Sequence, residues 1–153
     1  MRILSKCLLL GVVLLGCHPD RSVPTPVAPT EADPFRTVVY HTCYDGDTCM
    51  VSIPGLPEIF GDHILVRLAG IDTPEIKGKC HREKQLARQA RDLIRTVLSQ
   101  AEQISLVRPS RDKYFRIDAR VIADGQDVGA ILLERGLAVP YDGGTRNGSW
   151  CMQ

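Results

Sequence analysis

Strand-like patterning begins at Phe35 and recurs in short stretches after it. Valine, threonine and aromatic residues dominate residues 35–43, which is typical of a strand. The Asp-Gly pair at 45–46 suits a tight turn because such pairs tolerate positive φ angles. We therefore expect residues 47–53 to return as a second strand, which the Pro-Gly-Leu-Pro sequence at 54–57 ends.

The third predicted strand, residues 62–70, alternates between two faces. Ile64, Val66 and Leu68 fall on one face, and Arg67 should therefore point away from it. Residues 104–107 and 114–123 show similar patterning. The sequence therefore predicts five strands in all.

A helical period replaces this alternation over residues 82–100, where apolar side chains recur every three or four positions. Another face of this helix carries three arginines, Arg88, Arg91 and Arg95. They form either a solvated face or a weak guide for nucleic acid. A short second helix is predicted at 128–135, ended by Gly136. Together these elements predict an α+β fold, a small closed β-barrel with an inserted amphipathic helix and a short second helix.

The first seventeen residues have the pattern of an export signal. Arg2 and Lys6 precede an apolar stretch of about ten residues, which is too short to span a bilayer stably. The stretch ends at Leu14-Leu15-Gly16-Cys17, which resembles a bacterial lipobox, a signal whose cysteine is acylated. We expect Cys17 to carry the lipid. An ordinary secretory signal and an uncleaved anchor are the alternatives.

Residues 18–34 separate this signal from the patterned region. They contain five prolines and lack apolar periodicity. Such a tether extends by about 3.1 Å per residue, so it could reach roughly 50 Å. We place the folded domain at 35–153 and expect an exported chain, lipid-anchored to a bacterial membrane or extracellular. His18, rather than aspartate, follows the lipobox cysteine, which by resemblance to known sorting signals favours the outer membrane of a two-membrane cell.

The charge balance bears on the class of partner. The chain has a net charge of +1, and without Arg2 and Lys6 of the signal it carries 17 basic and 18 acidic residues. A protein that coats nucleic acid is usually strongly basic. Any hold on phosphate must therefore come from a few well-placed cations.

Four cysteines lie in the expected domain, namely Cys43, Cys49, Cys80 and Cys151. An even count in an exported chain favours disulfides, with three possible pairings. We prefer Cys43–Cys49, which flanks the tight turn, and Cys80–Cys151, which would tie down the C-terminus. Zinc binding is less favoured because the spacings lack a CxxC pair, and free thiols are the other alternative.

Three clusters of residues could carry chemistry. Asp45 and Asp47 place two carboxylates at a hairpin mouth, and carboxylate oxygens suit calcium. Residues 67–75 combine a cation with Asp72 and Glu75, and Pro74 keeps Thr73 from regular strand pairing, so that its carbonyl is available to a metal. Residues 111–116 mix cations with aromatics before a strand, as phosphate positioning would require.

Taken together, the three clusters closely resemble the staphylococcal-type thermonuclease family. The matching segments are Asp45-Gly46-Asp47-Thr48, Arg67 with Asp72-Thr73-Pro74-Glu75, Asp112-Lys113-Tyr114-Phe115-Arg116, Ala123-Asp124-Gly125 and Gly136-Leu137-Ala138. The resemblance covers about residues 35–141. It implies a five-stranded OB-fold barrel that binds one calcium ion and cleaves DNA and RNA on the 5′ side of the phosphate, leaving 3′-phosphate ends.

The resemblance also implies a role for each matched position. Asp47 and Asp72 would ligate calcium through their side chains and Thr73 through its carbonyl. Glu75 would be the general base, and Arg67 and Arg116 would contact the scissile phosphate. Lys113 and Tyr114 would hold a second phosphate, and Tyr141 either stacks on a base or packs at the rim.

The chain departs from the family at two places. Phe115 stands where the best-known member has glycine, which could shift the backbone of Arg116 or narrow the cleft. After Tyr141 a glycine-rich tail ends at Trp150 and Cys151, where that member continues into a further helix, and a Cys80 bridge would replace its packing. We interpret His81, beside Cys80, as a plain helix-start residue.

The sequence therefore favours a monomeric, calcium-dependent nuclease acting on single- or double-stranded DNA, and it leaves open whether RNA is also a substrate. The alternatives are an OB-fold lipoprotein that binds nucleic acid or protein without cleaving it, and a structural envelope lipoprotein. A relative that has lost catalysis would be expected to lack the general base or the arginines. This chain retains Arg67, Glu75 and Arg116.

Overall fold

The computed structural model describes residues 35, 37–144 and 150–152. The expected signal and tether, Cys17 included, lie outside the described residues. Within the described part, no helix is both long and apolar enough to cross a membrane.

Three antiparallel strands begin the barrel: β1 (Val39–Cys43), β2 (Thr48–Ser52) and β3 (Ile64–Leu68). In β3, Val66 and Leu68 are buried whereas Leu65 and Arg67 face outward, as the alternation predicted. The apolar inner positions explain why these stretches form strands, because each buries one face against a common core.

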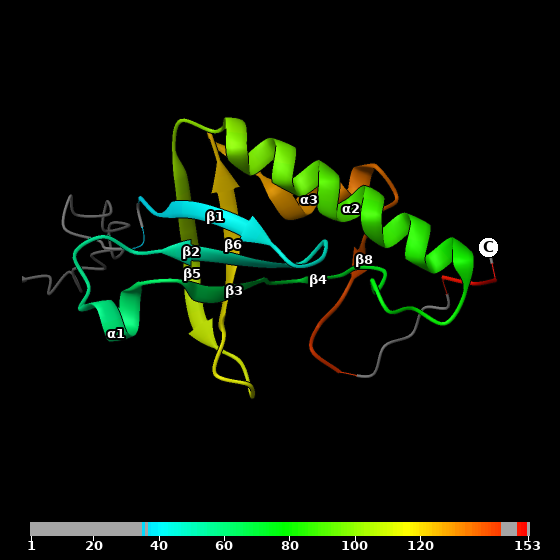
Figure 1. The fold of residues 1–153 in the computed structure, drawn as a ribbon, viewed down its shortest axis with the longest axis horizontal. Coiled ribbons are helices and arrows are strands. Elements are labelled where there is room, and N and C mark those ends of the chain that lie inside the picture. Colours follow the sequence, from blue (N-terminus) through cyan, green and yellow to red (C-terminus); the bar gives the residue numbers. More distant parts are fainter. Residues whose placement is uncertain (1–34, 36, 145–149, 153) are drawn as a thin grey trace, which may run out of the picture.

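The barrel is completed by β6 (Ile117–Ala123) and β5 (Ile104–Arg111). β6 pairs in parallel with β3 and antiparallel with β5, which gives the sheet order β1-β2-β3-β6-β5 (Figure 1). The segment before β1 returns to β5, since Val38 donates to the carbonyl of Ile104 and Leu106 donates to that of Phe35. The predicted five-stranded barrel of the OB type is thereby confirmed.

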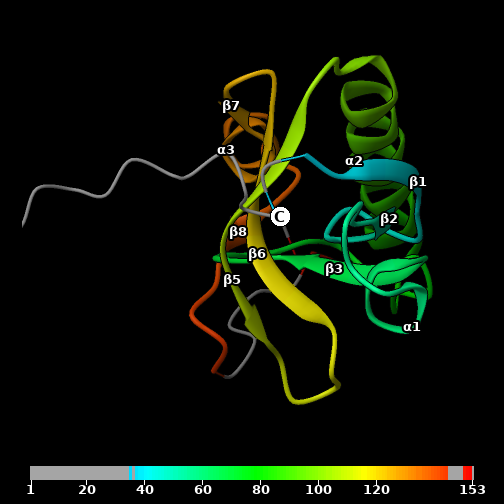
Figure 2. The same ribbon diagram turned by 90° about the vertical axis from the view of Figure 1, so that its left-hand side faces the viewer.

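The long helix α2 (His81–Gln100) covers one side of the curled sheet and contacts β1 (Figures 1 and 2). Its buried residues, which include Ala90, Ile94 and Leu98, join the core. The short helix α3 (Val128–Glu134) packs against β6 and α2, and Asp127 caps it by accepting from the amides of Gly129 and Ala130.

Three short strands complete the described structure. β4 (Ile71–Asp72) pairs with β8 (Val139–Pro140), and β7 (Gln126–Asp127) pairs with the end of β6. The first of these pairs lies beside the barrel rather than in it. It positions the residues that directly follow β4.

The structure corrects several expected element bounds. A single helical turn, α1 (Glu58–Gly61), follows the Pro-Gly-Leu-Pro break and was not predicted. β5 extends to Arg111 rather than ending at Val107, and β6 begins at Ile117 rather than Tyr114. The late start of β6 has a local cause: Asp112 accepts from the amides of Tyr114 and Arg116, which holds residues 112–116 in a turn.

The two disulfides join Cys43 to Cys49 and Cys80 to Cys151, the pairing favoured by the sequence. Cys43 and Cys49 are also register partners across the β1–β2 hairpin. The second bridge ties the C-terminal end to the N-terminal cap residue of α2, where the buried Trp150 lies next to Cys151.

Candidate functional site

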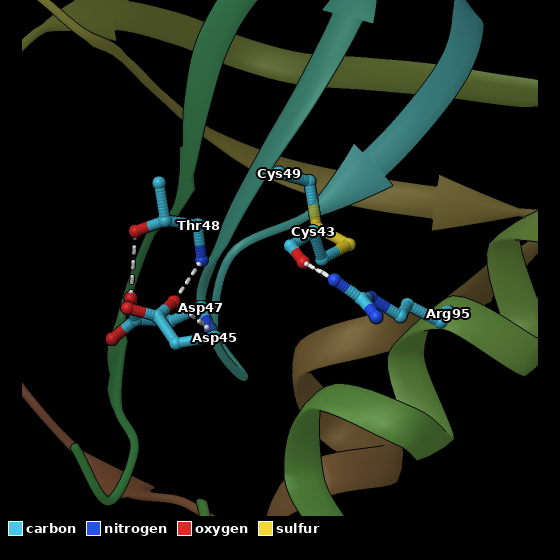
Figure 3. Close-up of a disulfide and its surroundings, with 6 residues drawn as sticks. All are labelled: Cys43, Asp45, Asp47, Thr48, Cys49 and Arg95. Atoms are coloured by element: carbon cyan, nitrogen blue, oxygen red, sulfur yellow. Dashed lines mark hydrogen bonds between the residues drawn. A yellow bond between two sulfur atoms is a disulfide. The ribbon is translucent and has the colours of Figure 1, made fainter. Parts of the chain in front are cut away.

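The turn between β1 and β2 holds its carboxylates by internal hydrogen bonds. One oxygen of Asp45 accepts from the amides of Asp47, at 3.1 Å, and Thr48, at 2.8 Å (Figure 3). The Thr48 hydroxyl donates to Asp47 at 3.0 Å. Both carboxylates are almost fully buried, with exposed fractions of 9% for Asp45 and 6% for Asp47. The turn is therefore held by its own hydrogen bonds, and its acidic residues are largely buried.

Gly46, at the tip of this turn, brings the first cluster against the second. A Cβ atom at Gly46 would lie 2.6 Å from the Cβ of Ala90 in α2 and 3.0 Å from the Cγ2 of Thr73. Its backbone lies outside the left-handed region, so the expected positive φ is wrong. Glycine is required here by space, because the turn packs directly on α2 and on Thr73.

Asp72, the last residue of β4, and the residues that follow it form the segment whose Thr73 packs against Gly46 of this turn. Asp72 and Thr73 are buried, with exposed fractions of 5% and 3%, and Pro74 is buried as well. The pairing of β4 with β8 stops at Asp72, so Thr73 lies outside the strand ladder, as Pro74 predicted. Glu75 is half-buried, and its carbonyl accepts from Gly78.

Burial and neighbouring acidic groups raise the proton affinity of Asp45. Burial, and next the negative charge of Asp47, raise the pKa of Asp45 to about 6, with a smaller contribution from Glu75. The amide hydrogen bonds from Asp47 and Thr48 act in the opposite direction but do not cancel this shift. Asp45 and Asp47 offer hard oxygen donors of the kind that a divalent cation such as calcium takes.

Arg67 leaves the outer face of β3 and is held at both ends of its guanidinium. It donates to the carbonyl of Ile71 at 2.8 Å and to Asp118 at 3.3 Å, and it lies 5.2 Å from the ring centroid of Tyr141. The side chain is thereby fixed between β3 and the segment that follows β8, and it reaches the pocket described below.

Arg116 connects the third cluster to the hairpin turn. Its Nε donates to Asp112 at 2.7 Å, and its Nη1 donates to the hydroxyl of Thr48 at 3.3 Å. Burial raises the pKa of Asp112, but the hydrogen bonds from Arg116 and from two backbone amides outweigh burial and hold it below its ordinary value. Asp112 is therefore an ionised anchor for Arg116.

A pocket of about 540 Å³ gathers residues from all three clusters. The acidic and basic side chains in its wall are Asp45, Asp47, Arg67, Glu75, Arg95 and Arg116. Carboxylates and guanidinium groups thus share one cavity, although they come from segments that are far apart in the chain. Asp72 and Thr73 are not part of this wall; they lie behind the turn.

A second pocket, of about 610 Å³, adjoins the first and shares Arg67 and Arg116 with it. The remaining residues proposed to contact substrate, Lys113, Tyr114 and Tyr141, all line it. Arg116 lies 5.5 Å from the ring centroid of Tyr114, so the aromatic ring and the guanidinium face one region.

Sequence reasoning missed Arg95 as a pocket residue. It is half-buried, and two of its nitrogens donate to the carbonyl of Cys43, at 3.0 and 2.6 Å (Figure 3). Reading it as part of a solvated face is therefore wrong for this arginine, whereas Arg88 is exposed as expected. The sequence did not distinguish Arg95 from Arg91, one helical turn earlier, because the residue that Arg95 contacts belongs to β1, which is distant in the chain.

Phe115 does not enter either pocket, so it does not narrow the cleft with its side chain. The ring is 79% exposed and lies over the guanidinium of Arg111, at 5.1 Å. Its backbone, however, has φ of +69°, a left-handed conformation that favours glycine. His81 is the exposed first residue of α2, as expected.

Comparison with known proteins agrees with this geometry. A family model described as staphylococcal nuclease homologue matches residues 65–149, more than half of the chain. A search of curated proteins found no match. The matched segment includes the arginines of both pockets and Glu75, and the barrel has the fold expected for the family. The chain therefore belongs to the staphylococcal nuclease homologue family.

Proposed function

We propose that this protein is a calcium-dependent nuclease that hydrolyses phosphodiester bonds of DNA and RNA and leaves 3′-phosphate ends. One observation carries the proposal: a single pocket holds Arg67, Arg116 and Glu75 together with the carboxylates of the hairpin turn. Membership in the nuclease family supports the reaction class. The pairing of cations with carboxylates is what an anionic substrate and a metal ion would both require.

Arg67 and Arg116 stabilise the phosphate as it gains negative charge during attack. A guanidinium offers several N–H donors in a fork that matches two phosphate oxygens. Both side chains are already held, Arg67 by Ile71 and Arg116 by Asp112, so little reorganisation is needed. A preorganised donor of this kind typically contributes about 3 kcal/mol to transition-state stabilisation.

Asp47 and Asp72 would hold calcium through their carboxylates, and Thr73 through its carbonyl. All three residues are buried, and Thr73 packs against Gly46 of the hairpin turn. Carboxylate and carbonyl oxygens are the ligands that calcium takes. Calcium bound there would polarise the phosphate and orient the attacking water. Asp45 supports this site by fixing the backbone of Asp47 and Thr48.

Glu75 removes a proton from the attacking water. It lies in the wall of the pocket with both arginines, so a water molecule between them can reach phosphate and carboxylate together. General-base catalysis of this type usually contributes a factor of about 10² to 10⁴. In the adjoining pocket Lys113 and Tyr114 would contact the next phosphate, and Tyr141 would stack on a base.

The test uses the purified full chain with single-stranded DNA, then with RNA. We expect cleavage with calcium, no cleavage with excess chelator, and a loss of at least 10²-fold in Glu75→Gln. Glu134→Gln, at the exposed end of α3, is the matched control and should cleave normally. Normal cleavage by Glu75→Gln would contradict the assigned base. Binding without cleavage in any divalent ion would contradict the nuclease.

We further propose that the protein is exported and held on a bacterial membrane by acylated Cys17, and that it acts as a monomer. The lipobox-like sequence and the proline-rich tether support the anchor. Replacement of Cys17 by serine should release the protein from the membrane fraction. Continued membrane association of that variant would contradict lipid anchoring.

A further inference from the structure

Two histidines and an aspartate meet at one end of the outer face of β1–β3. His41 comes from β1, whereas Asp62 and His63 lie between α1 and β3. Each can offer one ligand atom, and these atoms all lie within 4.8 Å of one another. All three residues are exposed to solvent. We call these residues, together with Ser52 of β2, the histidine cluster.

The backbone is adapted to bring these side chains together. The register of β1 with β2 shifts between Tyr40 and Thr42, so His41 sits in a β-bulge. Bulges turn a side chain that would otherwise follow the alternation. His63 has φ of +48°, a left-handed conformation that costs a non-glycine residue free energy. Two independent departures from regular geometry therefore converge on one exposed spot.

Ser52 connects the members of the cluster. Its hydroxyl donates to Asp62 at 2.6 Å, and the backbone amide of His63 donates to it at 3.2 Å. Because its proton is directed to Asp62, the contact with His41 Nε2, at 2.7 Å, must be a donation from His41. The Nδ1 atom of His63 lies 2.9 Å from Asp62. The two imidazole rings are stacked, with centroids 4.1 Å apart.

We propose that the histidine cluster binds a divalent transition-metal ion of the zinc class through His41, His63 and Asp62. Imidazole is a preferred ligand for such ions, whereas calcium takes oxygen ligands only. Tetrahedral zinc with ligands at about 2.0–2.1 Å places its donor atoms roughly 3.3 Å apart. Exposed side chains can close from 4.8 Å to that spacing by rotation, and water completes the coordination.

The histidine cluster is separate from the pocket that holds the carboxylates. Along β2, Met50 lines the pocket and Ser52, two residues further along the same face, belongs to the cluster, so the cluster and the pocket share one face of the sheet. His63 and Arg67 are four residues apart, which is about 13 Å along a strand. None of the cluster residues lines either pocket around the arginines. The proposed zinc site can therefore be tested independently of the proposed nuclease activity.

The test is calorimetric titration of the purified full chain with zinc chloride, in calcium sufficient to occupy the carboxylate site. We expect His41→Ala and His63→Ala each to bind one equivalent of zinc fewer than the wild type. His81→Ala is the matched control, since His81 is an exposed histidine outside the cluster, and it should bind as the wild type does. Ser52→Ala should weaken binding by about tenfold, because partners that orient a ligand affect affinity by 10- to 100-fold.

Two further measurements keep the result interpretable. Melting curves without metal should be alike for the wild type and the histidine variants, and zinc should raise the melting temperature of only those proteins that retain the cluster. Cobalt in place of zinc should give the visible absorption of a tetrahedral site, lost in His41→Ala. Equal zinc binding by all variants, or no binding by the wild type, would overturn the proposal. Loss in His81→Ala would place the metal elsewhere and overturn it too.

Discussion

The contact of Gly46 with α2 predicts that the smallest possible substitution at this position disturbs the site. In Gly46→Ala the new Cβ would lie 2.6 Å from the Cβ of Ala90, whereas carbon atoms pack at about 3.5–4.0 Å. Neither atom is the end of a flexible side chain. The hairpin turn, with Asp45 and Asp47, must therefore move by about 1 Å away from Thr73 and Ala90.

The expected effect has two parts. Overpacking of a close contact typically costs about 1–3 kcal/mol, so Gly46→Ala should lower the free energy of unfolding by that amount. A displacement of about 1 Å in a catalytic arrangement can reduce the rate by about 10²-fold, so cleavage of DNA with calcium should fall by one to two orders of magnitude. Calcium affinity should fall together with the rate, because the turn carries Asp47 while Thr73 stays with the segment after β4.

A double-mutant cycle with Ala90→Gly tests this reasoning. Alone, Ala90→Gly should cost about 1 kcal/mol, because glycine disfavours a helix interior. In combination with Gly46→Ala it removes the clashing atom, so stability and activity should recover relative to Gly46→Ala. Urea unfolding and initial cleavage rates measure both quantities. Additive losses in the double variant, or wild-type behaviour of Gly46→Ala, would refute the steric argument.

Three further outcomes are expected. Phe115→Gly should be about 1 kcal/mol more stable than Phe115→Ala, the reverse of the usual order, because φ of +69° is costly for any residue with a Cβ. Asp112→Asn should destabilise the protein at neutral pH, and its difference from the wild type should shrink as pH falls below about 4, the ordinary range of a carboxyl group. The lowered pKa of Asp112 means that its contact with Arg116 stabilises the fold above that range and is lost as pH falls through the folded value. Replacing both Cys80 and Cys151 by serine should lower the free energy of unfolding by about 4 kcal/mol, the loop-closure value for a bridge across 71 positions.

Each outcome has a direct measurement and a result that would contradict it. Urea unfolding gives the free energies of unfolding of Phe115→Gly and Phe115→Ala. Equal values would contradict the argument from the backbone angle. For Asp112→Asn, a stability difference from the wild type that is the same at pH 3 and pH 7 would exclude the ion-pair explanation. For the cysteines, the melting temperature should fall in the double serine variant and in the wild type under reducing conditions. An unchanged value would mean that packing around Trp150 holds the C-terminal end without the bridge.

Much of the barrel could be predicted from local patterning. The bounds of the long helix were expected to within one residue and those of the third strand to within two, because each has one apolar face with a clear period. The bounds of β5 and β6 were missed, since their ends depend on the turn that Asp112 closes rather than on apolar alternation. The turn α1 was missed because one helical turn is too short to show a period.

The chemistry-bearing residues were identified as three separate clusters, and their order along the chain resembled a known family. What could not be derived was how they are placed relative to one another. Arg95 was grouped with Arg88 and Arg91 on the polar face of the helix, either solvated or a weak guide for nucleic acid, yet it binds the carbonyl of Cys43. The histidine cluster was not expected either, because a bulge at His41 and a left-handed residue at His63 do not follow from apolar patterning.

The sequence by itself determined most of the elements and the residue types of the site, because periodicity and turn chemistry are local properties. It also favoured the cysteine pairing that the structure shows. Only the tertiary structure decided that Asp47, Glu75, Arg67 and Arg116 share one pocket. It also decided that Gly46 is required by space rather than by its backbone angle. The physical reason is that such contacts join segments distant in the chain. Their geometry is set by packing of the whole barrel against α2, which no short window of sequence contains.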